Sequence, residues 1–405
     1  MKRHFAFFLL TLNAVFASAQ LPCIRSNVKT ITYSINGKPT GNQWEISPEL
    51  KPDIMGFTSD RKHNRIVFYT DVDSFVCNAK PGEHCLFYIL LNGKDSALTR
   101  INVDKENKPA RFTDAYIRKN KGKSSFEIPE VQELVHIVMA LTPTGIKNEN
   151  LIEHRTGYYK EVMTFFDAWK NHSVVASLDK NLDNDYGVLK MDACGFVFKG
   201  HRIRKDETYN RVSWGAQNTL EPFVKQLEDF ARKSGFRAFY RSHRSYYDQL
   251  LQQAEKYMPV RPQWDWCEQE FPARYDHYRI TFSPLVNGWH CTNRFEDNHF
   301  KQTMMFICSA ERKGGDLSEK VWEGFMTRVV FTEIDHNYVN PVSDQYAETI
   351  HKIFSDRAFW VKEELTQGYN SPYSVFNEYM TWAVFSLYAY DNFSPEDFEK
   401  INKKE

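Results

Sequence analysis

The pattern of apolar and polar positions divides the chain into two regions. Between residues 22 and 117, short apolar and alternating runs are separated by turn residues. Asn-Gly pairs follow the runs 30–35 and 86–91, and such pairs favour tight hairpin turns because both residues tolerate positive φ. Short strands joined by these turns predict an antiparallel β-sandwich module over residues 20–118.

The second region has a different period. Apolar residues recur there every three or four positions, which is typical of helices packed on one side. The polar stretch 119–125 between the regions is interpreted as a linker. The patterns predict a helix beginning at Pro129, further helices over 158–169, 220–232, 245–257, 318–338, 343–354 and 372–390, and strands over 236–240, 278–282 and 302–308. The predicted fold class is therefore α+β, with an α/β domain over residues 126–400 whose C-terminal part is mostly helical.

The first residues have the pattern of an export signal. Lys2 and Arg3 give a positive start, residues 5–16 form a short apolar run, and residues 17–19 are the small residues of a cleavage site. The run is too short to span a membrane comfortably, and no later segment has the pattern of a transmembrane helix. We therefore predict a signal peptide over residues 1–19 and a protein exported to the periplasm or the exterior.

All seven cysteines follow the predicted cleavage site. An exported protein meets an oxidising compartment, where disulfides persist. Cys77 and Cys85 flank the turn at 80–82 and could form a disulfide across it. An odd number of cysteines leaves at least one free thiol unless a bond forms between molecules.

The charges of the chain are balanced. Lys and Arg together number 52, as do Asp and Glu, and removal of Lys2 and Arg3 would leave 50 against 52, a net charge of −2. This balance gives no bulk attraction for nucleic acid or an anionic membrane, so neither is an expected partner. Aromatic residues make up 15% of the chain and suit packed cores and amphipathic pockets. No pattern in the sequence sets an oligomeric state.

The predicted helix 318–338 carries two polar residues on its apolar face. At about 100° per residue, Glu333 and His336 fall on the apolar stripe, whereas Asp335 lies off it. The stripe consists of Trp322, Phe325, Met326, Val329 and Val330. Residues 332–336, Thr-Glu-Ile-Asp-His, differ only at the first position from His-Glu-x-x-His, the motif in which two His bind zinc and the Glu polarises the attacking water. The alternative interpretation is an internal Glu–His pair satisfied by a neighbour or by solvent.

A second carboxylate points to the same chemistry. Glu378 is the only charged residue between 371 and 390, where apolar and aromatic residues occur on every side and predict a buried helix. A lone carboxylate in such a helix needs a partner. Glu378 could complete a metal site with His336, or it could form a buried salt bridge, with Arg328 as one candidate.

Further residues could complete the site. Thr332 occupies the position of the missing motif histidine, and His290 or His299, from the excursion between the strands 278–282 and 302–308, could replace that ligand. Glu333 could itself be a ligand, as in other Glu-x-x-His metal sites. An oxyanion could be stabilised by a tyrosine such as Tyr379 or Tyr369.

Four stretches of the sequence resemble a family of uncharacterised secreted proteins typical of Bacteroidetes, known only as a domain of unknown function. They are residues 44–53, 90–96, 281–285 and 333–341. The first two resemble an N-terminal module of other exported hydrolases of those bacteria. The resemblance implies a zincin-like metallopeptidase domain over residues 126–400, in which a sheet precedes the active-site helix and its edge strand borders the cleft. It implies that Glu333 is the general base and that His336 and Glu378 are zinc ligands. Thr332 stands where the family pattern has a ligand His.

These observations predict an exported metal-dependent hydrolase, a zinc metallopeptidase with the degenerate motif Thr-Glu-Ile-Asp-His and a downstream glutamate. Its expected substrate is a peptide or protein. The alternative is a catalytically inactive protein that binds peptide or glycan on a zincin scaffold. Zinc content separates the two interpretations, because only the first requires the metal.

Overall fold

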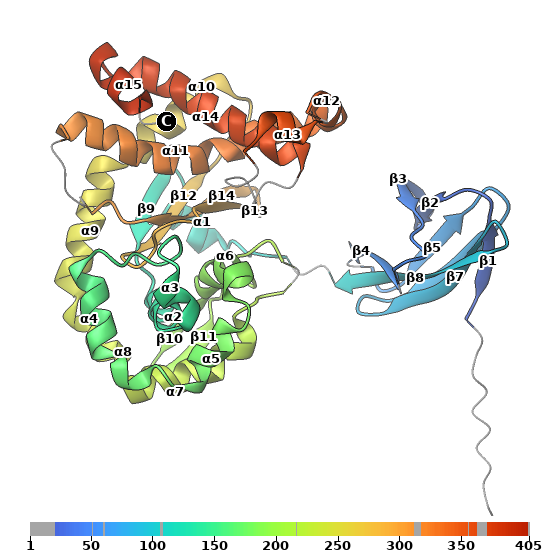
Figure 1. The fold of residues 1–405 in the computed structure, drawn as a ribbon, viewed down its shortest axis with the longest axis horizontal. Helices are drawn as coiled ribbons and strands as arrows, with labels where there is room; N and C mark the ends of the chain where they lie inside the picture. Colours follow the sequence, from blue (N-terminus) through green and yellow to red (C-terminus); the bar gives the residue numbers. More distant parts are fainter. Residues whose placement is uncertain are drawn as a thin grey trace, which may run out of the picture. The chain divides into compact units, whose positions relative to one another are not determined.

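The computed structural model describes residues 21–50, 52–59, 61–105, 108–215, 217–311, 317–354, 356–362 and 371–403. The predicted signal peptide and Tyr369 lie outside these residues. The chain divides into two compact units, residues 1–107 and 108–405 (Figure 1). Helices and strands both contribute, which confirms the α+β class. Among the described residues, no helix has the length and apolar character needed to cross a membrane.

The first unit is built from two four-stranded sheets. One has the order β1 (Cys23–Ser26), β7 (His84–Leu91), β8 (Asp95–Lys105) and β4 (Asp53–Ser59), and the other has the order β3 (Lys38–Glu45), β2 (Thr30–Ile35), β5 (Asn64–Tyr69) and β6 (Ser74–Ala79). Asn36 and Asn92 both have positive φ at the predicted Asn-Gly turns. The prediction of a purely antiparallel module was wrong, because β1 pairs with β7 in parallel and β4 pairs with β8 in parallel.

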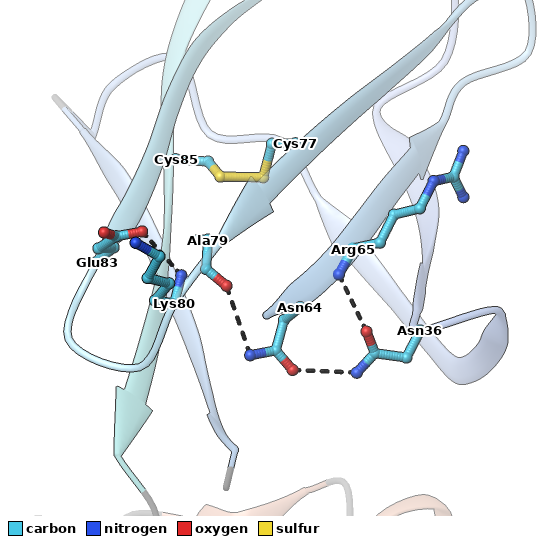
Figure 2. Close-up of a disulfide and its surroundings, with 8 residues drawn as sticks. All are labelled: Asn36, Asn64, Arg65, Cys77, Ala79, Lys80, Glu83 and Cys85. Carbon is cyan, nitrogen blue, oxygen red and sulfur yellow. Dashed lines mark hydrogen bonds between the residues drawn. A yellow bond between two sulfur atoms is a disulfide. The ribbon is translucent and has the colours of Figure 1, made fainter. Parts of the chain in front are cut away.

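Both sheets contribute to one hydrophobic cluster and are also joined covalently. Alternate residues of the strands, such as Phe68 of β5 and Phe87 of β7, point into this cluster because successive side chains of a strand face opposite sides. The disulfide Cys77–Cys85 confirms the predicted pairing. It connects β6 to β7, which belong to different sheets (Figure 2). Cys23, Cys194, Cys267 and Cys291 are free thiols.

The second unit has a central sheet with the order β13 (Cys291–Asp297), β14 (Phe300–Cys308), β12 (His277–Ser283) and β9 (Lys123–Glu127). β9, β12 and β14 are parallel, and β13 is antiparallel to β14 at one edge. The polar stretch 119–125 is therefore not a linker. It contains the end of α1 (Asp114–Asn120) and the start of β9, and it lies within the second unit.

Helices cover both faces of this sheet (Figure 1). One side carries α10 (Val260–Glu270), α11 (Glu319–Ser343), α14 (Pro372–Asn392) and α15 (Pro395–Asn402), and the other carries α2 (Glu130–Ala140), α5 (Ser173–Asp179), α6 (Leu182–Ala193) and α7 (Val224–Ser234). The remaining elements are α3 (Pro143–Lys147), α4 (Gly157–Phe165), α8 (Phe236–Ser242), α9 (Arg244–Tyr257), α12 (Ala347–Ile353), α13 (Arg357–Trp360), the hairpin β10 (Phe196–Lys199) and β11 (Arg202–Lys205), and the short 3₁₀ helices Asp167–Trp169, Glu221–Phe223 and Asp344–Tyr346.

Two predicted elements differ from the structure. Residues 236–240, predicted as a strand, belong to helix α8, which buries Phe236 and Phe239 one turn apart. Helix α14, predicted to be buried on every side, exposes one aromatic-rich face that includes Tyr379 and Tyr390. The strands predicted at 278–282 and 302–308 correspond to β12 and β14.

Candidate functional site

Helix α11 holds two of the predicted site residues on one face. The side chain of Ser318 caps the helix by accepting a hydrogen bond from the Val321 amide. Glu333 and His336 are three residues apart, so their side chains lie on the same face. The helix packs against the sheet through β13 and β14 and against α10, α14 and α15. This packing buries the Glu333 side chain.

Glu378 of α14 meets His336 of α11. His336 Nε2 lies 3.4 Å from Glu378 Oε1, and the two side chains are 20% and 25% exposed. His336 Nδ1 is 3.3 Å from the side-chain oxygen of Asn340. Burial by itself lowers the pKa of His336, but the hydrogen bond to Glu378 and the negative charges of Glu333 and Glu378 outweigh it, so the pKa is raised. The structure thus pairs the two residues predicted as metal ligands.

Glu333 lies in the field of this pair. Burial raises its pKa to about 7, and the Glu378 charge adds to the rise, whereas His336 and Lys190 oppose it. A carboxyl group with a pKa near neutrality can both accept and donate a proton under working conditions. The position of Glu333 therefore suits general acid–base chemistry.

The other predicted participants lie in different surroundings. The Thr332 hydroxyl donates to the Arg328 carbonyl of its own helix at 3.1 Å, which directs it along α11. His290 is half-buried immediately before β13, whereas His299 lies exposed in the turn between β13 and β14. Thr292 of β13 contacts α11 through the side chain of Asn337, the residue after His336. The turn that holds His299 is roughly 20 Å along the strand from Thr292, at about 3.3 Å per residue. The structure therefore does not bring His299 to the site.

Two further expectations concerned Arg328 and Tyr379. The Arg328 guanidinium lies over the rings of Phe325 and Trp382, and the ion pair of Glu378 is with His336. The Tyr379 hydroxyl donates to the Trp360 carbonyl at 2.6 Å, so its proton is engaged outside the His336–Glu378 pair.

Asp335 is buried, although the helical projection predicted that it lies off the apolar face of α11. The projection assumed one apolar stripe, but neighbours surround α11, and Asp335 is fully buried. Burial raises its pKa well above the usual range, and the charges of Glu333 and Glu378 raise it further. Burial therefore favours the protonated form of Asp335. Because α11 has neighbours on all sides, a prediction based on one apolar stripe could not identify Asp335 as a buried residue.

Two charged residues of α6 were not predicted at all. Lys190 and Asp192 are both fully buried near the start of the edge strand β13. Lys190 donates to the Trp289 carbonyl, and Asp192 accepts from the backbone amides of Val212 and Ser213. Their signal in the sequence is two opposite charges inside an otherwise apolar run, 188–198.

The donor set fits a metal ion only in part. Tetrahedral zinc with ligand bonds of about 2.0–2.1 Å separates adjacent donor atoms by about 3.3 Å, close to the 3.4 Å between His336 Nε2 and Glu378 Oε1. Among the described residues, however, no group of three or more His, Cys, Asp and Glu side chains has the arrangement of a metal site. The structure therefore brings together two potential donor atoms, with the carboxylate of Glu333 on the same face of α11.

Comparison with models of known protein families, with curated proteins and with solved structures found no match to this chain. Inferences about function therefore rest on the geometry of the site.

Proposed function

We propose that the second unit is a metal-dependent hydrolase that acts on peptides after export of the chain. The observation that carries the proposal is the 3.4 Å approach of His336 Nε2 to Glu378 Oε1 from two different helices. The carboxylates of Glu333 and Glu378 favour positive charge at this point, as the raised pKa of His336 indicates, and a bound cation would supply that charge in place of the imidazole proton.

His336 and Glu378 are the proposed ligands. Bound zinc would supply a Lewis acid that polarises the substrate carbonyl and a water molecule. Glu333 would accept the proton of that water and return it to the leaving amine, a role that a pKa of about 7 suits. If Glu333 instead takes the third ligand position, its substitution removes the metal as well as the activity.

The topology of the second unit supports the same proposal. The chain passes from the parallel strand β14 to α11, and the antiparallel strand β13 forms the edge of the sheet on that side. α14, which carries Glu378, packs against α11. This order of elements supports a zincin-like domain, in which an edge strand would border the cleft and a later helix would supply a glutamate.

The test is the zinc content of the purified exported chain after zinc loading, with peptide hydrolysis measured in parallel. We expect about one equivalent of zinc in the native chain. His336→Ala and Glu378→Ala should weaken binding by more than ~100-fold, since losing even an outer-shell partner weakens metal binding about 10–100-fold. Glu333→Gln should keep the metal and lose hydrolysis if Glu333 is the base.

Thr332→His is the matched gain-of-ligand variant. It supplies the missing imidazole one turn before His336 and should tighten zinc binding while leaving the rest of α11 unchanged. A native chain that takes up no zinc at any loading would contradict the proposal.

The second candidate is a peptide-binding protein without catalysis on the same scaffold. The engaged Thr332 hydroxyl favours it, because a side chain bonded to its own helix supplies no ligand. Zinc uptake by Thr332→His alone, together with peptide binding by the native chain, would identify this function.

A further inference from the structure

Two exposed tryptophans flank the start of the edge strand β13. Trp214 is 53% exposed and Trp289 is 50% exposed. Large aromatic side chains dominate the energetics of cores and interfaces, so an exposed ring that is held in place suggests a binding surface. Each of these residues is fixed by a fully buried charged residue of helix α6.

Trp289 is held in an unfavourable backbone conformation. Its φ is +58°, in the left-handed region that bulky residues seldom adopt. Lys190 donates to its carbonyl. Its ring lies over Gly187 of α6, where an added Cβ would come within 3.0 Å of the indole. Strained residues are retained where the surroundings over-determine them, and they cluster at functional sites.

A network of hydrogen bonds centred on the Asp192 carboxylate holds the segment that carries Trp214. The Asp192 carboxylate accepts from the amides of Val212 and Ser213 at 2.8 Å each and from the Ser213 hydroxyl at 2.8 Å. The Trp214 indole then donates to the carbonyl of Thr292 in β13 at 3.3 Å. Backbone, hydroxyl and indole contacts together fix the position of this ring relative to the edge strand.

Thr292 connects both tryptophans to the site. It lies three residues after Trp289, and its hydroxyl is 3.4 Å from the Asn337 side-chain nitrogen. Asn337 directly follows His336 in α11. The charge of Glu333 also acts on Lys190, which holds Trp289. Trp214, through Thr292 and Asn337, and Trp289, through Lys190, are therefore each connected to the part of α11 that carries Glu333 and His336.

We propose that Trp214 and Trp289 are the specificity-determining residues of the proposed hydrolase and hold an apolar side chain of a peptide substrate. The inference rests on the proposed function for the peptide nature of the ligand. The Thr292 carbonyl, at the outer edge of β13, accepts a hydrogen bond from the Trp214 indole, so this ring is held against the edge strand.

The rings favour an apolar side chain over a sugar. An indole has one polar group, its N–H, and that of Trp214 is already bonded to Thr292. What Trp214 offers a ligand is mainly apolar surface. A sugar would need polar partners for its hydroxyl groups, whereas a large apolar residue needs none.

The test is fluorescence polarisation with two labelled pentapeptides, Ser-Gly-Phe-Gly-Ser and Ser-Gly-Gly-Gly-Ser, on the full chain carrying Glu333→Gln to prevent cleavage. We expect the phenylalanine peptide to bind at least ~10-fold more tightly, the scale of discrimination in apolar pockets. Trp214→Ala or Trp289→Ala should abolish that preference, and Trp289→Phe should retain part of it. Phe165→Ala, at a similarly exposed ring on α4, is the control and should behave as the unsubstituted chain.

The outcomes separate this inference from the proposed function. Tryptophan-dependent preference in a chain that takes up no zinc would support the inference and contradict the hydrolase. Equal binding of both peptides, no peptide binding, or an unchanged preference in both alanine variants would overturn the inference. Binding of an oligosaccharide with the same tryptophan dependence would overturn the choice of ligand.

Discussion

Glu133 is a buried carboxyl group outside the candidate site, and its protonation affects the free energy of unfolding. It lies fully buried on α2, where the Tyr158 hydroxyl donates to its Oε1 at 2.6 Å. Burial raises its pKa to about 7, from an ordinary value of 4.5. The folded chain therefore keeps this proton to a higher pH than the unfolded chain.

The first prediction follows from this shift. The free energy of unfolding should fall as pH rises from 4.5 to about 7, because the unfolded chain has then lost a proton that the folded chain retains, and it should level off above 7. A shift of about 2.5 pKa units corresponds to roughly 3 kcal/mol. Urea unfolding at several pH values measures it. Glu133→Gln mimics the neutral form, should remove this part of the slope and should be the more stable protein above pH 7.

The control for Glu133 is an exposed carboxylate. Glu255→Gln on α9 changes the same charge at an exposed position and should leave the pH dependence as it is. An identical slope in the native chain and in Glu133→Gln would contradict the assigned protonation.

At the level of residues, the sequence predicted the polar side chains that interrupt an apolar stripe. Glu333, His336 and Glu378 were selected because each is charged or polar where apolar neighbours indicate burial, and the structure brings them together. Lys190 and Asp192 were missed because their partners belong to loops that are distant in the sequence. Those contacts depend on the fold, and no local pattern of side chains encodes them.

At the level of elements, the disulfide is a predicted contact that the structure confirms. Cys77 of β6 and Cys85 of β7 are eight residues apart and join two different sheets. Near this bond, Asn64 of β5 bonds to Asn36 and to the Ala79 carbonyl, as Figure 2 shows. The crosslink therefore reinforces the place where the chain passes from one sheet to the other.

Removing the crosslink should destabilise the first unit alone. For a loop of this length, the chain-entropy model gives about 2–3 kcal/mol. Hydrogen exchange of peptides from β6 and β7 in the full chain should accelerate in the double variant Cys77→Ala/Cys85→Ala, while peptides from α11 keep their rates. Cys23→Ala removes a free exposed thiol and should change neither. Unchanged protection of β6 and β7 in the double variant would show that the sheets do not need the bond.

Elements were predictable where local chemistry decides them. The Asn-Gly turns and the strands β12 and β14 follow from the sequence pattern. Helix α8 did not, because its aromatic residues favour a strand, whereas the structure buries Phe236 and Phe239 on one helical face after Gly235 ends α7 with a φ of +74°. The strand β9 was missed because its polar residues pair at an edge of the sheet, where burial gives no signal.

At the scale of the whole molecule, the division at residue 107 predicts that the first unit folds without the second. Its hydrophobic cluster draws only on residues between Ile24 and Val103, and its disulfide is internal. Domains somewhat above 70–80 residues can stabilise a core of their own, and a crosslink adds to that margin. Residues 20–107 expressed alone should therefore unfold cooperatively, at the same urea midpoint that hydrogen exchange gives for β5 and β7 in the full chain. The reduced segment should unfold at a lower urea concentration, and residues 108–405 should keep their own midpoint when expressed separately. An unfolded segment 20–107 with its disulfide intact would mean that this sheet pair depends on contacts from the rest of the chain.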